Sequence, residues 1–538
     1  MVRSHPSAHC RDSQGGHGGG LKNPRCQFDS DSRHRFMLRK ISSTMISQHP
    51  DNASKPYWHN STFVSIRHET KECFLSFSDL GVSEYKWDWE GKYVDESVIE
   101  RLFSEYHDYF KNNPLGKEKF LTFRLPNPKV ETEFRLGRAF MGILGAAGLA
   151  KQIGVHSPPL FEVILPMTES AEEMIAIQEA FREIASLKHA LYDFGEESLK
   201  HIEIIPLFEQ VSTIISSDRI LEKYWQLHVK RFHFKPPYFR PYLARSDPAL
   251  NSGLVPTVLA IKISLSHYIE FEKKHNVKLY PIIGSASLPF RGGLTPNTVE
   301  QFCNEYRGIK TTLLQSAFRY DYEKKLVIKA IKKLEKILPQ GKAVSISMSE
   351  EKTLKKIITV FERYYRNTVE QLAPLINIVA ADLPRRRERV LHIGLFGYSR
   401  GVGKVKLPRA IGFTGALYSL GIPPEIMGTG RGIAYAIKTN QIKLLEKYYL
   451  NIKEDLRRAG RFLQKDEIIK LAAESQVWND ILKDVLEIEK YLGEKLEPKT
   501  KEEKKHFETV KKLHEKMNSG KNYQQYLNQL AKLRKSLG

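Results

Sequence analysis

The chain has 538 residues, of which 41% are hydrophobic, and its formal net charge is +22. No apolar run reaches the length of a membrane-spanning helix, and the four cysteines lie far apart without a CxxC pair. These features argue against a membrane protein, a disulfide framework and a cysteine-based zinc site, and we expect a protein of the reducing cytoplasm. The charge indicates an anionic partner, either nucleic acid or a small polyanion.

The first 36 residues differ in composition from the rest of the chain. The stretch HPSAHCRDSQGGHGGG (5–20) has almost no large apolar side chain and cannot build a core. It also lacks the apolar segment of a secretory signal, although its basic character leaves a transit peptide open. We interpret residues 1–36 as a disordered tail, or as translated sequence ahead of a start near Met37. Residues 37–538 are predicted to form a single catalytic domain.

From about residue 118, short apolar runs alternate with helical patterns, which predicts parallel strands joined by crossover helices. The predicted strands lie at 119–126, 161–167, 201–209, 238–247, 278–287, 311–320 and 391–400. We take PPEIMGTG (423–430) as the candidate eighth strand, which would close a (β/α)8 barrel. An open doubly wound sheet is the alternative. Additional helices are expected within about 320–390 and 432–538, outside the barrel.

Charged residues stand at or just after the ends of these strands, where a β/α barrel places its function. Taken alone, each of these residues is more simply explained as a member of a surface ion pair. Together, they place two carboxylates among several arginines. Hard divalent cations such as Mg²⁺ or Mn²⁺ take carboxylate oxygens, and arginine holds phosphate or carboxylate in a fixed orientation. The pattern indicates a metal-assisted enzyme that acts on a phosphorylated acid. The residues are Arg124, Glu209, Asp247, Arg291, Arg319 and Arg400.

The stretch GYSRGVGKVKLPR (397–409) is glycine-rich and basic and follows an apolar run, as phosphate-binding turns do. It is not a nucleotide P-loop, because Tyr398 stands where the first glycine belongs and Val405 where the metal-binding hydroxyl belongs. The sequence therefore predicts a phosphate site here, without a nucleotide.

Four motifs in one consistent order resemble the archaeal-type, or short-form, phosphoenolpyruvate carboxylases. They are QHPDN (48–52), SDPALN (246–251), FRGG (290–293) and LPRAI…YSLGIPPE (407–425), with KWDWEGKYVD (86–95) between the first two. The resemblance runs from about Leu38 to the end of the chain. It implies the carboxylation of phosphoenolpyruvate with bicarbonate to oxaloacetate and phosphate, through carboxyphosphate and a pyruvate enolate.

The resemblance also implies roles for individual residues. Glu209 in IIPLFEQV and Asp247 in SDPALN resemble the Mg²⁺ ligands, and Glu169 in ILPMTES is a decoy whose context matches another strand. His49 resembles the catalytic histidine, which acts as a base or stabiliser of the carboxyphosphate step. The remaining assignments are the catalytic arginines Arg291 and Arg400, and Arg124, Arg409 and, as a nearby candidate, Arg319 for substrate binding.

The chain departs from the long form of the family at two positions. Leu250 stands where the long form has a lysine and Pro289 where it has a histidine, so another cation such as Lys404 or Lys406 is expected to compensate. Family members are usually homotetramers. A different Mg²⁺-dependent barrel enzyme acting on phosphoenolpyruvate or pyruvate, a lyase or a phosphotransferase, is the alternative. A nucleic-acid-binding protein is a remote one, because no such motif is present and the two strand-end carboxylates would be unexplained.

Overall fold

The computed structural model describes residues 39–538, apart from 93, 130, 132–133, 156, 190–191, 194–198, 388–400 and 403–404. Within Ile41–Gly538, which form one compact unit, eight parallel strands close into a barrel in the order β1-β12-β11-β9-β7-β4-β3-β2. The predicted (β/α)8 barrel is thereby confirmed, and the open sheet is excluded. The barrel strands are β1 (Thr44–Ser47), β2 (Glu84–Asp88), β3 (Phe120–Arg124), β4 (Glu162–Leu165), β7 (Glu203–Phe208), β9 (Tyr242–Leu243), β11 (Ile282–Ile283) and β12 (Thr311–Leu314).

The predicted set of strands differs from the observed one. The six barrel strands β3, β4, β7, β9, β11 and β12 fall inside the predicted runs, whereas β1 and β2 were not predicted. The predicted strand 423–430 is wrong: residues 424–428 form a turn and Thr429 begins a helix. Pro423 and Pro424 have no N–H group to donate to a β-ladder, which explains why this segment cannot add a strand. The predicted strand 391–400 lies outside the described residues.

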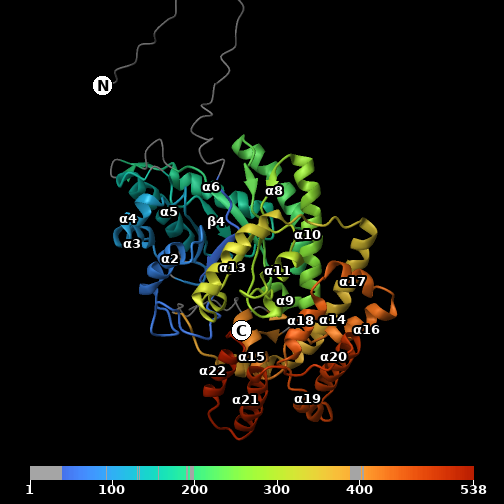
Figure 1. Ribbon diagram of the computed structural model, residues 1–538. Coiled ribbons are helices and arrows are strands. Elements are labelled where there is room, and N and C mark those ends of the chain that lie inside the picture. The colour runs from blue at the N-terminus through green and yellow to red at the C-terminus, as the bar shows by residue number, and fades with distance from the viewer. Residues whose placement is uncertain are drawn as a thin grey trace, which may run out of the picture. The chain divides into compact units, whose positions relative to one another are not determined.

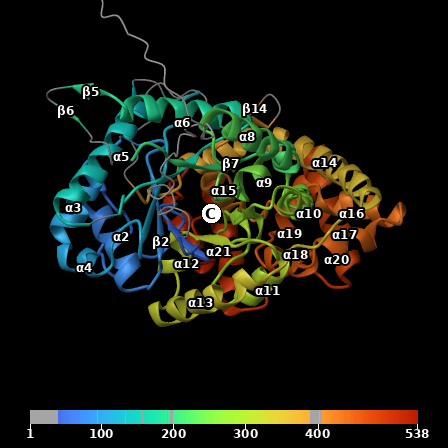
Figure 2. The ribbon, with the colours of Figure 1, turned by 90° about the horizontal axis from the view of Figure 1, so that it is seen from above.

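Helices surround the barrel, as Figure 2 shows in the view from above. They are α2 (Glu69–Ser78), α3 (Val98–Glu105), α4 (His107–Asn112), α5 (Arg135–Gln152), α6 (Ala171–Ala185), α7 (Val211–Ile215), α8 (Ser217–Phe232), α9 (Ser246–Ser252), α10 (Leu254–His275), α11 (Val299–Glu305), α12 (Ser316–Tyr320) and α13 (Lys324–Ile337). Among the described helices, α10 alone is long and apolar enough to cross a membrane. Its apolar window is 78% buried inside the protein, which is typical of a core helix.

The second half of the chain adds helices at one end of the barrel, below it in Figure 1. They are α14 (Met348–Ala381), α15 (Ala410–Ser419), α16 (Thr429–Lys438), α17 (Ile442–Tyr448), α18 (Ile452–Gly460), α19 (Lys465–Ala472), α20 (Gln476–Leu492), α21 (Lys501–Asn518) and α22 (Gln524–Leu533). The long helix α14 begins with a capping box, in which Ser347 and Glu350 each accept a main-chain N–H of the other residue. Short two-stranded ladders complete the structure: β5 (Lys188–His189) with β6 (Tyr192–Asp193), β8 (Tyr238–Phe239) with β10 (Lys278–Leu279), and β13 (Gly401–Val402) with β14 (Val405–Lys406).

The barrel interior is packed in layers, as (β/α)8 barrels generally are. One layer is polar: the guanidinium of Arg240 lies 2.8 Å from Glu84 and 2.9 Å from Glu162, and all three side chains are buried. A second layer is a buried apolar cluster formed by Met45, Ile164, Ile205, Leu207, Tyr242, Ala244, Ile282 and Leu313. Because each inward carboxylate has a partner in the polar layer, β2 can carry charged residues on its inner face.

Candidate active site

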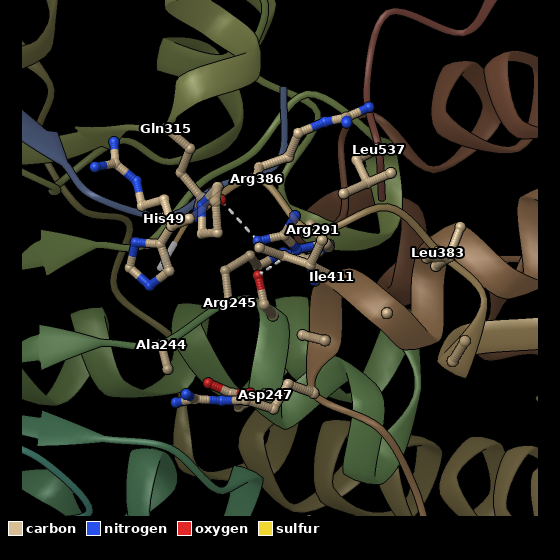
Figure 3. A pocket seen from close by; sticks show the side chains of 18 of the residues that line it. His49, Ala244, Arg245, Asp247, Arg291, Gln315, Leu383, Arg386, Ile411 and Leu537 are labelled. Carbon is tan, nitrogen blue, oxygen red and sulfur yellow. Dashed lines mark hydrogen bonds between the residues drawn. The ribbon is translucent and has the colours of Figure 1, made fainter. Parts of the chain in front are cut away.

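A pocket of about 520 Å³ opens where the barrel strands end. Its walls come from segments that follow the strands, from the residues after α14, from the start of α15 and from Leu537. Figure 3 shows His49, Arg291 and Asp247, which come from different elements, around this one pocket. The predicted site residues that line it are His49, Arg124, Glu209, Asp247, Arg291 and Arg409.

The floor of the pocket is apolar apart from one phenol. Leu207, Tyr242 and Ala244 belong both to the apolar layer of the barrel and to the pocket lining. Burial raises the pKa of Tyr242, and the carboxylates of Asp88, Glu209 and Asp247 raise it further, against the opposing effect of Arg124. The Tyr242 hydroxyl therefore stays protonated and can only act as a neutral hydrogen-bonding group at physiological pH.

Two carboxylates of the pocket are suited to a divalent cation. Glu209 directly follows β7, is 4% exposed, and its Oε2 accepts the main-chain N–H of Met167 at 3.0 Å. Asp247 is half-buried in the first turn of α9. No group of three or more His, Cys, Asp or Glu side chains in the described part of the chain is arranged to hold a metal. A pair of carboxylates fits Mg²⁺, which is commonly bound by one or two of them together with substrate oxygens.

Arg291 is fixed by contacts to several elements although it lines the pocket. Its Nε donates to Ser246 Oγ at 3.1 Å and its Nη2 to Gln315 Oε1 at 2.7 Å; Arg291 and Gln315 are labelled in Figure 3. Its Nη1 donates to the main-chain carbonyl of Gly538 and lies 3.5 Å from the buried carboxylate of Asp51. Burial lowers the pKa of Arg291 from its ordinary value, against the effect of Asp51. The guanidinium is thus preorganised rather than free to follow a ligand.

Arg124 is held by carboxylates at the end of β3. Its Nε lies 2.7 Å from Asp88 and its Nη1 2.5 Å from Glu90, and Asp88 also binds the buried ammonium of Lys86 at 2.6 Å. Burial, followed by the charge of Arg124, lowers the pKa of Lys86 to about 8. Arg409, the N-cap residue of α15, approaches the same Glu90 to 3.8 Å. Glu90 therefore lies between the two arginines.

The QHPDN motif follows β1 as an irregular segment and contacts the start of α12. The ring nitrogen Nδ1 of the half-buried His49 lies 2.9 Å from Ser47 Oγ, and its main-chain carbonyl accepts a hydrogen bond from Ser316 Oγ at 2.8 Å. Asp51 accepts from Ser316 Oγ and from the main-chain N–H of Ala317, at 3.0 and 2.7 Å. These contacts fix His49 at the edge of the pocket.

The other predicted residues lie elsewhere. Arg319 is not part of the pocket lining: it lies in α12, where its Nη1 donates to Glu72 Oε1 at 3.1 Å and its Nη2 to the Ser47 carbonyl at 2.9 Å. Arg400 and Lys404 are outside the described residues. Glu169, which was set aside as a decoy, pairs with Lys129 on the surface at 2.8 Å.

Several cations of the pocket were missed from the sequence. Arg245 lies next to the SDPALN motif and Arg385, Arg386 and Arg387 stand in the run PRRRERV, which looks like a solvated charge run. The signal that could have revealed this run is its place directly before an apolar segment, since the start of a strand seldom needs three consecutive arginines. Leu250 and Pro289, the two departures from the long form, are both buried.

Comparisons with known proteins identify the family of this chain. The family model described as phosphoenolpyruvate carboxylase matches residues 41–538. A phosphoenolpyruvate carboxylase of Metallosphaera sedula is 38% identical in a comparison 522 residues long that covers 93% of this chain and 100% of the relative. One of Pyrococcus abyssi is 41% identical over 79% of this chain and 88% of its own, and one of Leuconostoc mesenteroides is 38% identical over 87% and 93%. The chain belongs to the phosphoenolpyruvate carboxylase family.

Proposed function

We propose that this chain carboxylates phosphoenolpyruvate with bicarbonate, giving oxaloacetate and phosphate. One observation carries the proposal: two strand-end carboxylates, Glu209 and Asp247, line the same pocket as Arg124, Arg291 and Arg409, in a member of this family. In the proposed course, a bicarbonate oxygen attacks phosphorus and the enolate of pyruvate leaves, so that carboxyphosphate forms. The C–O bond of carboxyphosphate then breaks to give CO₂ and inorganic phosphate, which takes up the carboxyl proton, and the enolate carbon forms its new bond to the CO₂.

Glu209 and Asp247 are the residues that would hold Mg²⁺ or Mn²⁺. When bound, the ion supplies positive charge near the enolate oxygen and the substrate carboxylate. The arginines supply the remaining fixed charge, which favours the transfer of a phosphoryl group because negative charge is redistributed during the step. Arg291 and Arg409 would orient the phosphate. Arg124, held by Asp88 and Glu90, would face the carboxylate end of the substrate.

His49 is placed to assist at the carboxyphosphate step. Its Nδ1 is close to Ser47, so the opposite ring nitrogen is the one proposed to take or stabilise the bicarbonate proton. Water must be kept from the enolate, which it would protonate to pyruvate. Apolar side chains of Leu383, Ile411 and Leu537 in the pocket wall support this exclusion.

The test is the bicarbonate-dependent formation of oxaloacetate from phosphoenolpyruvate and Mg²⁺, followed by coupling to malate dehydrogenase. Glu209→Ala and Asp247→Ala should each abolish it and should weaken Mn²⁺ binding measured by electron paramagnetic resonance. Glu169→Ala is the matched control, a surface carboxylate beyond a neighbouring strand. Full activity of either pocket variant would refute the metal assignment. Products other than oxaloacetate would favour another lyase or a phosphotransferase.

A homotetramer and a cytoplasmic location belong to the same proposal. The first is supported by the family resemblance and the second by the scattered cysteines. Cys73 and Cys303, the cysteines within the described residues, are both buried, and neither forms a disulfide. Sedimentation equilibrium would test the assembly, and a mass other than four chains would refute it.

A further inference from the structure

The glycine-rich segment Leu288–Gly293, which carries Arg291, is bridged at its base by an arginine from outside the barrel. Arg458 of α18 donates from Nη1 to the carbonyl of Gly293 and from Nη2 to the carbonyl of Ser287, each at 3.2 Å. These two carbonyls flank the turn, so a single guanidinium joins its two ends. Helix α18 packs against the 3₁₀ turn Pro289–Arg291 of the segment.

The main chain of the segment is also held by the side chains of Arg245 and Glu425. Arg245 donates to the carbonyls of Phe290 and Pro289 at 2.8 and 3.1 Å, and Glu425 accepts the main-chain N–H of Phe290 at 2.7 Å. The backbone turns sharply, with φ of +71° at Gly293. A Cβ atom there would lie 3.1 Å from Arg458 Nη1, so the glycine leaves room for the close approach of this guanidinium.

We propose that Arg458 is a positioning residue for the carboxylation, acting through the main chain of the segment on Arg291. This inference rests on the function proposed for the pocket. The Arg291 guanidinium reaches Ser246 and Gln315 from the main-chain position that this turn sets. A displacement of about 1 Å at a reacting centre can cost about a hundredfold in rate. Holding the two ends of the turn together therefore keeps the arginine where charge develops.

Arg458 is itself oriented by its neighbours, while the adjacent arginine is not part of the bridge. Asp455 Oδ1 lies 3.9 Å from Arg458 Nη1, and Tyr449 donates to Asp455 Oδ2 at 2.7 Å. Arg457, one residue earlier on α18, instead binds Glu494 at 2.5 Å. Both arginines are partly exposed members of ion pairs, with side-chain exposures of 18% for Arg458 and 33% for Arg457, although Asp455 beside Arg458 is buried. Arg457→Ala is thus a matched control for Arg458→Ala.

Hydrogen exchange tests the bridge independently of activity. The amides of Arg291 and Gly293 donate to the Leu288 carbonyl at 2.9 and 3.0 Å, and that of Leu294 to the Ala286 carbonyl at 2.9 Å. In Arg458→Ala these amides should exchange about tenfold faster, because the turn opens locally. In Arg457→Ala their exchange should be unchanged. Equal exchange in wild type and Arg458→Ala would overturn the proposal.

Kinetics test the consequence. Arg458→Ala should lower kcat about tenfold with a KM for phosphoenolpyruvate within about twofold, and should release more pyruvate per oxaloacetate. Arg458→Lys keeps the charge but cannot bridge two carbonyls with a planar fork, so its kcat should lie between those of wild type and Arg458→Ala.

A double-mutant cycle tests whether Arg458 acts through Arg291. In an Arg291→Ala background, adding Arg458→Ala should have no further effect, whereas fully additive losses would refute the coupling. A wild type that makes no oxaloacetate would refute the proposed function, while hydrogen exchange would still decide the bridge.

Discussion

Replacing Glu72 by glutamine removes the negative charge from a buried cluster behind the pocket wall. The Glu72 carboxylate accepts from Arg387 at 2.6 Å, from Arg319 at 3.1 Å, from Tyr320 at 2.6 Å and from Tyr85 at 3.1 Å. Arg387 also lines the pocket. The substitution therefore leaves two buried guanidiniums with less opposing charge and loosens one wall of the site.

The size of the effect follows from the pKa of Glu72. Burial alone would raise it, but Arg387 and Arg319 outweigh burial and lower the pKa from the ordinary 4.5 to about 2. A depression of this size corresponds to about 3 kcal/mol, in line with the roughly 3–5 kcal/mol lost when one partner of a buried pair is removed. A chain with about five hundred ordered residues unfolds with about 1 kcal/mol/K of entropy, so Tm should fall by about 3 °C.

The direction in which this stabilisation changes with pH follows from the same shift in the pKa of Glu72. Because the folded pKa lies below the unfolded one, the stabilisation is complete above about pH 4.5 and is lost as the pH falls toward 2. Scanning calorimetry of wild type and Glu72→Gln should thus give a Tm difference at pH 7 that shrinks at pH 4. The KM for phosphoenolpyruvate should rise. Glu100 is an exposed carboxylate on α3, and Glu100→Gln should change neither the Tm nor the KM for phosphoenolpyruvate. An equal Tm loss in both variants, or a difference independent of pH, would refute the reasoning.

Three further predictions concern stability and metal dependence. Burial raises the pKa of Glu425 to about 7, so ionisation of this carboxyl destabilises the fold as the pH rises from about 4.5 through 7. The Tm of Glu425→Gln should therefore match that of wild type at pH 5 and exceed it at pH 8. A Tm difference that does not change with pH would contradict this. Gly430→Ala should lower Tm, because its Cβ would lie 2.0 Å from the Asp484 carbonyl, while Gly145→Ala, with open space, should raise stability by about 0.5–1 kcal/mol. Chelation should abolish oxaloacetate formation and added Mg²⁺ or Mn²⁺ should restore it; activity unaffected by a chelator would exclude the metal role.

The barrel could be predicted from the alternation of apolar runs and helical patterns, but its first two strands could not. β2 reads EYKWD, and its alternate residues Glu84, Lys86 and Asp88 are charged yet buried. Such a strand looks like a surface segment in the sequence, because the partners that neutralise it, such as Arg240 and Arg124, lie far along the chain. Conversely, residues 423–430 were predicted to be a strand only from their spacing along the chain, and the two prolines of this segment argue against a strand.

The pocket was predictable where a residue lies at the end of a barrel strand or within a few residues after it. Arg124, Glu209 and Asp247 line it for that reason. Arg319 was placed near the site by the same rule, but β12 ends at Leu314 and the short α12 carries Arg319 into the cluster around Glu72. Contributions such as Arg387 depend on how the second half of the chain packs over the barrel, which no local pattern encodes.

The distribution of the site along the chain has a consequence for biosynthesis. All the barrel strands lie before residue 315, while pocket walls come from the start of α15 and from Leu537. At a synthesis rate of roughly 5–20 residues per second, the 224 residues from 315 to 538 take roughly 10–45 s to emerge. During that interval the pocket lacks the walls that α15 and Leu537 supply over Leu207 and Tyr242, so the site can be completed only after the last residues have emerged.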